Sequence, residues 1–280
     1  MRTINLFGKF AMLVAIASFG FLTSCKDDET VNLQDITDAS SESLSESYFQ
    51  DADDISIYAI DNKSNAGASR SAGDDDYRIT CAEISKTGGS TSGTVVIDFG
   101  TGVGCTDGKG NVRKGKINLA YEGTLGAVNF TITETFDNYS INGIVLEGTR
   151  VIKRIEASSQ ANVKHSIKLT GGKATWPDAS FAVRASSFER EWNPTDGTIT
   201  LTGDAEGTSR SGKTYSMDIT SALIYKTSCI AEGIYMATTG IKVFTIDGKP
   251  ITINFGDGTC DRKIAITVNG ITKEVTVSKI

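Results

Sequence analysis

The sequence has few of the residues from which catalytic and metal sites are usually built. Its 280 residues contain one histidine, His165, and neither a CxxC nor an HExxH motif, which removes two common signatures of a zinc site. No GxSxG elbow accompanies His165, so the usual signature of a serine hydrolase is missing as well. We therefore assign no catalytic residue, no metal and no cofactor, and we interpret the protein as a non-enzyme.

Positive charge is also scarce. The chain has 28 basic and 34 acidic residues, and between Lys26 and Thr80 the acids outnumber the bases by 14 to 4. Binding to nucleic acid depends on neutralising phosphates with Lys and Arg, and the rest of the chain shows no basic stripe. The composition therefore argues against a nucleic-acid partner.

Long hydrophobic runs are missing too. A membrane-spanning helix needs roughly 20 apolar residues, whereas the longest run, Phe10–Leu22, is shorter and follows a basic N-terminal segment, as in a signal peptide. The residues Leu22-Thr23-Ser24-Cys25 resemble the bacterial lipobox. The resemblance implies cleavage after Ser24 and acylation of Cys25, and two or three acyl chains would hold the mature protein in membrane lipid.

A charged tetrapeptide follows the cysteine. Lys26-Asp27-Asp28-Glu29 resembles the export signal of Bacteroidota surface lipoproteins. The resemblance implies transfer to the outward face of the outer membrane, so that the protein faces the cell exterior. The alternative is a solvated spacer in a lipoprotein that faces the periplasm.

Composition divides the chain into five segments. We expect a signal peptide at 1–24, a tether at 25–38, a helical segment at 39–61, an acidic linker at 62–76 and a β-rich domain at 77–280. The tether and the linker bury too little apolar surface to offset the entropy of ordering them. Between them, apolar residues recur at near-helical spacing and predict one short amphipathic helix; they are Leu44, Tyr48, Phe49, Ala52, Ile55 and Ala59.

Strand-like alternation dominates the β-rich domain. Apolar residues occupy every second position in several segments, with polar residues between them, as is typical of half-buried antiparallel strands. We predict a mainly β fold, an antiparallel meander that forms a curved sheet or a sandwich, with one short N-terminal helix. The alternating sets are Ile117, Leu119 and Tyr121; Val128, Phe130 and Ile132; and Val163, His165, Ile167 and Leu169.

Turn residues predict four hairpins and one strand register. Asn142-Gly143, Asp247-Gly248 and Asn269-Gly270 favour the positive φ angles of tight hairpins, and Pro177-Asp178 fits the centre of a fourth turn. If Trp176 pairs with Ala179 across that turn, three further pairs follow: Val163 with Trp192, Lys164 with Glu191 and His165 with Arg190.

Two cysteine-containing segments, 81–155 and 229–280, form a loose repeat of a strand, a glycine turn and a cysteine. With Cys25 acylated, four cysteines remain, which allow three disulfide connectivities. The repeat favours Cys81–Cys105 and Cys229–Cys260, and four free buried thiols are the alternative. The layout resembles secreted Bacteroidota lipoproteins with strand–FGxGxC segments and a W-P turn, which implies a fold rather than an activity.

Few side chains indicate a site. His165 is interpreted as a partly buried packing residue. Glu134 is the best single carboxylate for glycoside hydrolysis, although a solvated or Arg-paired glutamate at a sheet end is the favoured interpretation. Trp176 and Trp192 are the candidate ligand-binding aromatics, with packing at the sheet end as the alternative. Calcium in the glycine turns at 107–111 and 257–261 is left open, because neither turn has the EF-hand pattern.

Three functions remain. The first is a non-enzymatic surface lipoprotein whose β-domain binds an extracellular polymer or protein partner, or has a structural role. The second is a carrier that holds a hydrophobic ligand between the helix and the curved sheet, which an apolar cavity there would favour. The third is a surface glycan-acting hydrolase, which needs two carboxylates or a metal in one cleft.

Overall fold

The structure, a computed structural model, describes residues 32–63, 76–156 and 162–277. Every described element belongs to one compact unit, Val31–Ile280. Cys25 and the charged tetrapeptide 26–29 lie outside the described residues. The lipid anchor and the export signal therefore stay predictions.

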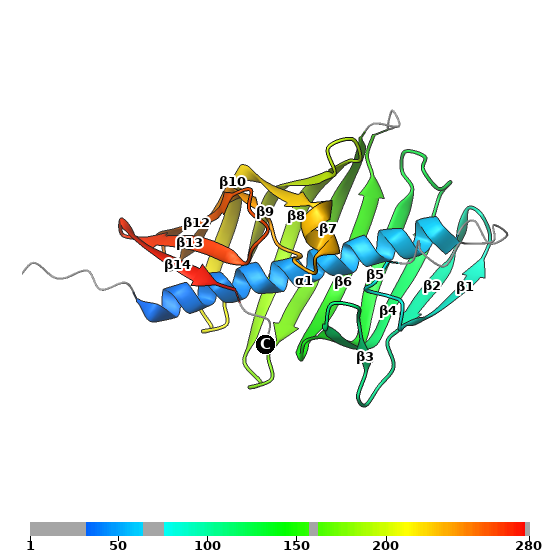
Figure 1. The fold of residues 1–280 in the computed structure, drawn as a ribbon, viewed down its shortest axis with the longest axis horizontal. Helices are drawn as coiled ribbons and strands as arrows, with labels where there is room; N and C mark the ends of the chain where they lie inside the picture. The colour runs from blue at the N-terminus through cyan, green and yellow to red at the C-terminus, as the bar shows by residue number, and fades with distance from the viewer. Residues whose placement is uncertain (1–31, 64–75, 157–161, 278–280) are drawn as a thin grey trace, which may run out of the picture. The chain divides into compact units, whose positions relative to one another are not determined.

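The described residues form two helices and fourteen strands (Figure 1). The helices are α1 (Leu33–Lys63) and α2 (Thr227–Ala231). The strands are β1 (Glu83–Gly88), β2 (Ser92–Asp98), β3 (Cys105–Thr106), β4 (Val112–Glu122), β5 (Thr131–Ile141), β6 (Ile144–Arg154), β7 (Val163–Thr175), β8 (Phe181–Asn193), β9 (Thr198–Thr208), β10 (Thr214–Lys226), β11 (Thr239–Ile246), β12 (Lys249–Asp257), β13 (Lys263–Val268) and β14 (Ile271–Thr276).

All the strands belong to one antiparallel sheet. From β1 to β14 the order in the sheet follows the order in the chain, with short β3 paired to β4 off this path. The predicted mainly β meander is confirmed, as a single sheet rather than a sandwich. Bulges interrupt several ladders; at Gly115, in β4, φ is +75° and an added Cβ would lie 2.3 Å from the carbonyl oxygen of Asn138. Such bulges bend and twist the bulged strand.

The three tight hairpins form as the dipeptides predict. Asn142, Asp247 and Asn269 have φ angles of 50°, 49° and 49°, and the glycine after each also has a positive φ. The flanking residues pair directly, as Ile141 does with Ile144. This is the backbone that a two-residue turn between right-twisted strands requires.

The turn at Pro177 differs from the prediction by one residue. The backbone N–H of Trp176 donates to Ser180 and not to Ala179, whose φ is +65° in a longer loop. Further along, a bulge between Leu169 and Gly172 shifts the pairing of β7 with β8 by one residue in the opposite direction. The two shifts cancel, so the three predicted pairs Val163–Trp192, Lys164–Glu191 and His165–Arg190 are all present.

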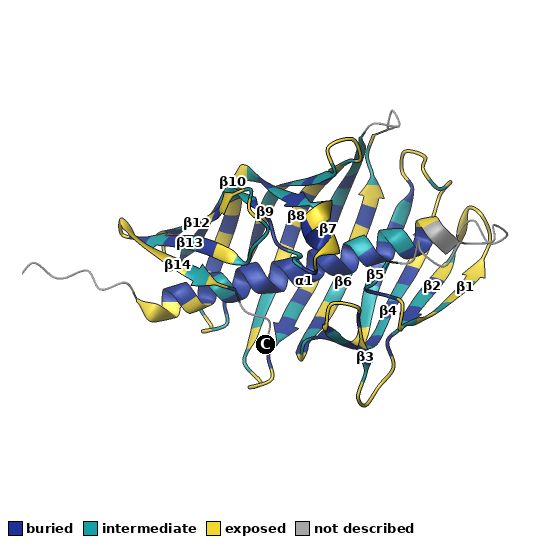
Figure 2. Ribbon diagram, in the orientation of Figure 1, coloured by how far each residue is buried: buried dark blue, intermediate teal, exposed yellow. Residues whose placement is uncertain are grey.

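Helix α1 is longer and more buried than expected. It begins at Leu33 and ends at Lys63, so residues 33–38 are helical rather than tether and residues 62–63 are helical rather than linker. Figure 1 shows it lying across the strands along one face of the sheet, and Figure 2 shows that most of its length is buried. Every residue from Ser41 to Asp53 is buried, which is not the pattern of an amphipathic surface helix.

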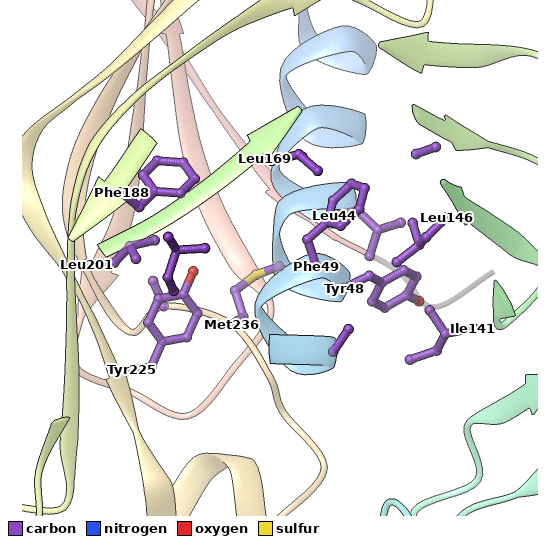
Figure 3. Close-up of a cluster of buried hydrophobic side chains, with 14 of the residues drawn as sticks. Leu44, Tyr48, Phe49, Ile141, Leu146, Leu169, Phe188, Leu201, Tyr225 and Met236 are labelled. Atoms are coloured by element: carbon purple, nitrogen blue, oxygen red, sulfur yellow. The ribbon is translucent and has the colours of Figure 1, made fainter. Parts of the chain in front are cut away.

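Loops as well as strands enclose α1. Tyr235, in the loop between α2 and β11, donates a hydrogen bond to the carbonyl oxygen of Gln50 (2.9 Å). In Figure 3, Met236 and Tyr225 lie on one side of α1, and Ile141 and Leu146 lie on the other. The predicted apolar residues of α1 all join this core.

Both predicted disulfides are present. Cys81–Cys105 joins the segment before β1 to β3, and Cys229–Cys260 joins α2 to the turn between β12 and β13. The alternation predicted for residues 128–132 holds for Phe130 and Ile132, which are buried, but not for Val128. That residue lies in the loop between β4 and β5 and is 39% exposed, because the strand begins only at Thr131.

Candidate functional site

Acidic side chains of α1 face basic side chains of the sheet along most of the helix. Removing a charge from water is costly, and an ion pair with further hydrogen bonds offsets that cost. This pairing lets an acidic helix serve as the core of the unit. From the N-terminal end of α1 the pairs are Asp35–Lys213, Glu42–Lys242, Glu46–Arg184, Asp51–Arg113, Asp53–Arg150 and Asp54–Arg190.

The most buried of these pairs is Asp53–Arg150. Arg150 donates from Nε to Oδ1 of Asp53 (2.6 Å) and from Nη2 to Oδ2, and neither side chain has any exposed surface. Burial raises the pKa of Asp53 to about 6, against the opposing effect of Arg150. Glu134 of β5 faces Arg150 across the ladder and is fully buried. Burial, together with the carboxylate of Asp53, raises the pKa of Glu134 well above its usual value.

A pocket with a volume of about 530 Å³ lies beside the C-terminal half of α1. Side chains from α1, α2, strands β5 to β9 and the adjoining loops line it. Most of its wall is apolar or aromatic, and its principal contributors are Tyr58, Phe130, Ile132, Val163, Trp192 and Ile199.

Three basic side chains form a row along the sheet wall of this pocket. Arg154 of β6 pairs with His165 of β7, and His165 pairs with Arg190 of β8. All three line the pocket. Directly opposite residues on antiparallel strands place their Cβ atoms about 4.5–5.5 Å apart, so the register brings the two guanidinium groups to either side of the imidazole.

His165 is a neutral imidazole at physiological pH. Burial lowers its pKa, and the charges of Arg190 and Arg154 lower it further, to about 3. No described residue hydrogen-bonds to its Nδ1 atom, which is buried. His165 is more buried than the predicted partly buried residue, with 7% of its surface exposed, and it lies in the pocket wall rather than in closed packing.

Ion pairs join α1 to the pocket wall. Arg78, just before β1, contacts both Asp54 (2.7 Å) and Asp76, and Asp54 also contacts Arg190 (2.7 Å). Burial alone would raise the pKa of Asp54, but the guanidinium groups of Arg78 and Arg190 outweigh it and lower that pKa below its usual value. Asp54 is therefore an anion that fixes Arg190 in the wall.

The two candidate ligand-binding tryptophans have different environments in the structure. Trp192 is 38% exposed and lines the pocket, as a ligand-binding role requires. Trp176 is only 2% exposed and lies under the guanidinium of Arg210, 4.7 Å from the ring centroid, so its proposed role as a binding platform is wrong. The ring of Trp176 packs at the turn that begins at Pro177, just after the end of β7.

The carboxylates considered for catalysis and for calcium binding have structural roles. Glu134 is neither solvated nor at a sheet end, and it does not line the pocket. Asp107 accepts hydrogen bonds from the backbone of Lys109 and Asn111, so it caps its own turn. Among the residues that the structure describes, no group of three or more His, Cys, Asp or Glu side chains could hold a metal ion.

Sequence reasoning predicted the His165–Arg190 pair but missed the buried ion pairs and the position of Arg154 beside His165. The sequence did contain a signal for the buried ion pairs. Arg150 lies two residues from the buried Ile152 and Arg190 two residues from the buried Phe188, so each arginine points to the same face of its strand as a core residue. A basic residue on the apolar face of a strand needs an acidic partner. The acids of α1 were the available partners, and Asp53 and Asp54 are the ones that pair with Arg150 and Arg190.

Comparison of the chain with protein-family models, curated proteins and solved structures finds no match. Within the described ranges, no helix has the length and apolar character needed to cross a bilayer.

Proposed function

We propose that this protein is a lipid-anchored, outward-facing outer-membrane protein whose β-domain binds a small, mainly apolar molecule in the pocket between α1 and the sheet. The pocket carries the binding proposal, and the lipobox-like segment ending at Cys25 carries the anchoring. The pocket beside α1 opens to solvent, and its volume of about 530 Å³ is within the roughly 300–1,000 Å³ of small-molecule sites.

The wall of the pocket suits an apolar ligand. Trp192 and Tyr58 contribute rings from the sheet and the helix, and Ile132 and Ile199 contribute aliphatic surface. The carboxylates in the wall do not favour hydrolysis, because two of the three, Asp54 and Asp76, already pair with Arg78 and only Asp61 is left for a reaction that needs two. Holding a ligand is the role that this arrangement supports best, and it combines the binding protein and the carrier among the three functions considered.

Fluorescence titration tests the proposal. The chain from Lys26 onward retains the whole compact unit and both disulfides. We expect N-phenyl-1-naphthylamine, an uncharged apolar probe, to bind saturably with one site per chain. Dodecanol should displace it.

Two tryptophan variants locate the binding. Trp192→Ala removes a wall of the pocket and should weaken probe binding about tenfold, the equivalent of part of one aromatic side chain's transfer free energy. Trp176→Phe is the matched control, because Trp176 does not line the pocket, and it should leave affinity unchanged. Absence of saturable binding, or equal affinity in both variants, would refute the proposal.

A further inference from the structure

The pocket has a polar band beside an apolar band. Side chains two residues apart on a strand lie on the same face of the sheet, so the register places rows of side chains one above another. Arg154, His165 and Arg190 form the middle row. Val163, Trp192 and Ile199 form the row on one side of it and line the pocket. Ile152, Ile167 and Phe188 form the row on the other side, which belongs to the buried core and not to the pocket wall.

Two buried nitrogen atoms of the middle row lack partners. His165 and Arg190 are 7% and 3% exposed. No described residue hydrogen-bonds to Nδ1 of His165 or to Nε of Arg190, although Nη2 of Arg190 bonds to Asp54. A buried polar group without a partner destabilises the folded protein, because it has lost its hydrogen bonds to water. Both atoms can donate a hydrogen bond, the imidazole as its Nδ1–H tautomer, so together they would satisfy an acceptor.

The charges around the row disfavour a doubly charged acceptor. Three acids face the pocket, Asp54 and Asp61 from α1 and Asp76 from the segment before β1. Three guanidinium groups face it as well, those of Arg78, Arg154 and Arg190. His165 adds no charge. A monoanion would disturb this balance by one unit, whereas a dianion such as a phosphate monoester would disturb it by two.

We infer that the pocket binds an aliphatic monocarboxylic acid, whose carboxylate accepts hydrogen bonds from His165 and Arg190 and whose chain lies against Trp192 and Ile199. This inference deepens the proposed function and rests on it. The carboxylate oxygens satisfy Nδ1 of His165 and Nε of Arg190, and charge-assisted hydrogen bonds of this kind are stronger than neutral ones. Arg154, on the other side of the imidazole, adds a second positive charge near the carboxylate.

A comparison of head groups on one chain length tests the inference. Dodecanoate, dodecanol and dodecyl phosphate should each be titrated against the bound probe at pH 8, where the carboxylate is ionised. We expect dodecanoate to bind at least tenfold more tightly than dodecanol, as a hydrogen bond to a charged group implies, and more tightly than dodecyl phosphate.

Variants separate the head-group contact from the apolar contact. His165→Phe keeps a ring in the wall but removes the donor, so the preference for dodecanoate over dodecanol should fall several-fold. His165→Gln restores a donor and should restore most of the preference. Trp192→Ala, the control, should weaken both ligands equally and leave their ratio unchanged.

Each outcome is decisive. If no dodecyl compound displaces the probe, the proposed function fails and the inference fails with it. If dodecanol and dodecanoate bind equally, the proposed function stands and the carboxylate inference is overturned. A preference for dodecyl phosphate overturns the choice of a monocarboxylate. An unchanged ratio in His165→Phe overturns the role of His165.

Discussion

The buried pair Asp53–Arg150 gives a quantitative test of how α1 is held. We consider the single substitutions Asp53→Leu and Arg150→Met, and the double substitution. Both side chains have no exposed surface and share two hydrogen bonds. Breaking a buried pair by removing one partner typically costs about 3–5 kcal/mol, whereas replacing both partners by apolar residues is often neutral or stabilising.

The two single variants should not be equivalent. Arg150→Met leaves Asp53 without a counter-ion, so at pH 7 it takes up a proton. In the parent the pKa of Asp53 is already about 6, so protonation at pH 7 adds about 1 pKa unit, or ~1.4 kcal/mol, to the loss of the two hydrogen bonds from Arg150. We expect a total cost of about 3–5 kcal/mol of unfolding free energy. Asp53→Leu leaves Arg150 charged, but Glu134 faces it across the ladder and can ionise to replace the lost partner. We therefore expect Asp53→Leu to cost less, about 2–3 kcal/mol.

Urea denaturation at pH 7, followed by tryptophan fluorescence on the chain from Lys26 onward, measures these differences. The double variant Asp53→Leu/Arg150→Met should recover most of the loss and lie within about 1–2 kcal/mol of the parent. If the two single losses simply add in the double variant, the two side chains do not act as a compensated pair and the reasoning is refuted.

Three further predictions concern other parts of the chain. The pKa of Glu134 is raised in the native state, whereas in the unfolded state this side chain loses its proton above a pKa of about 4.3. The stability of the parent protein therefore falls as the pH rises above that value. Glu134→Gln should remove this loss, so the substitution should be more stabilising at pH 8 than at pH 5 when thermal midpoints are compared. Cys81→Ser/Cys105→Ser opens a loop of 24 residues and should cost about 3–4 kcal/mol in denaturant unfolding. Cys25→Ala should abolish acylation, measured by mass spectrometry, and release the protein from the membrane fraction.

Each of the three has a contradicting result. The same stability difference at pH 5 and pH 8 would mean that Glu134 is ionised in the native state. An unchanged unfolding midpoint on removal of the 81–105 disulfide would show that it does not restrict the unfolded chain. Membrane retention of the Cys25→Ala protein, or an unmodified thiol at Cys25 in the parent, would remove the anchor from the proposal.

Features that depend on neighbouring residues could be read from the chain. The positive φ angles of Asn142, Asp247 and Asn269 follow from their own chemistry and from the glycines after them. The pair His165–Arg190 could be predicted because a register propagates along two strands joined by a short turn. That prediction succeeded although the turn differed by one residue, since the bulge near Gly172 compensated for it.

Features that depend on contacts between distant parts of the chain could not be predicted from the sequence. Periodicity placed the apolar residues of α1 correctly, but it cannot show whether the opposite face meets water or protein. That face is buried because arginines such as Arg150 and Arg184, remote from α1 in the chain, supply counter-charges. The pocket has the same origin: its wall joins Tyr58, His165, Trp192 and Ile230, which only the curvature of a complete sheet around one helix brings together.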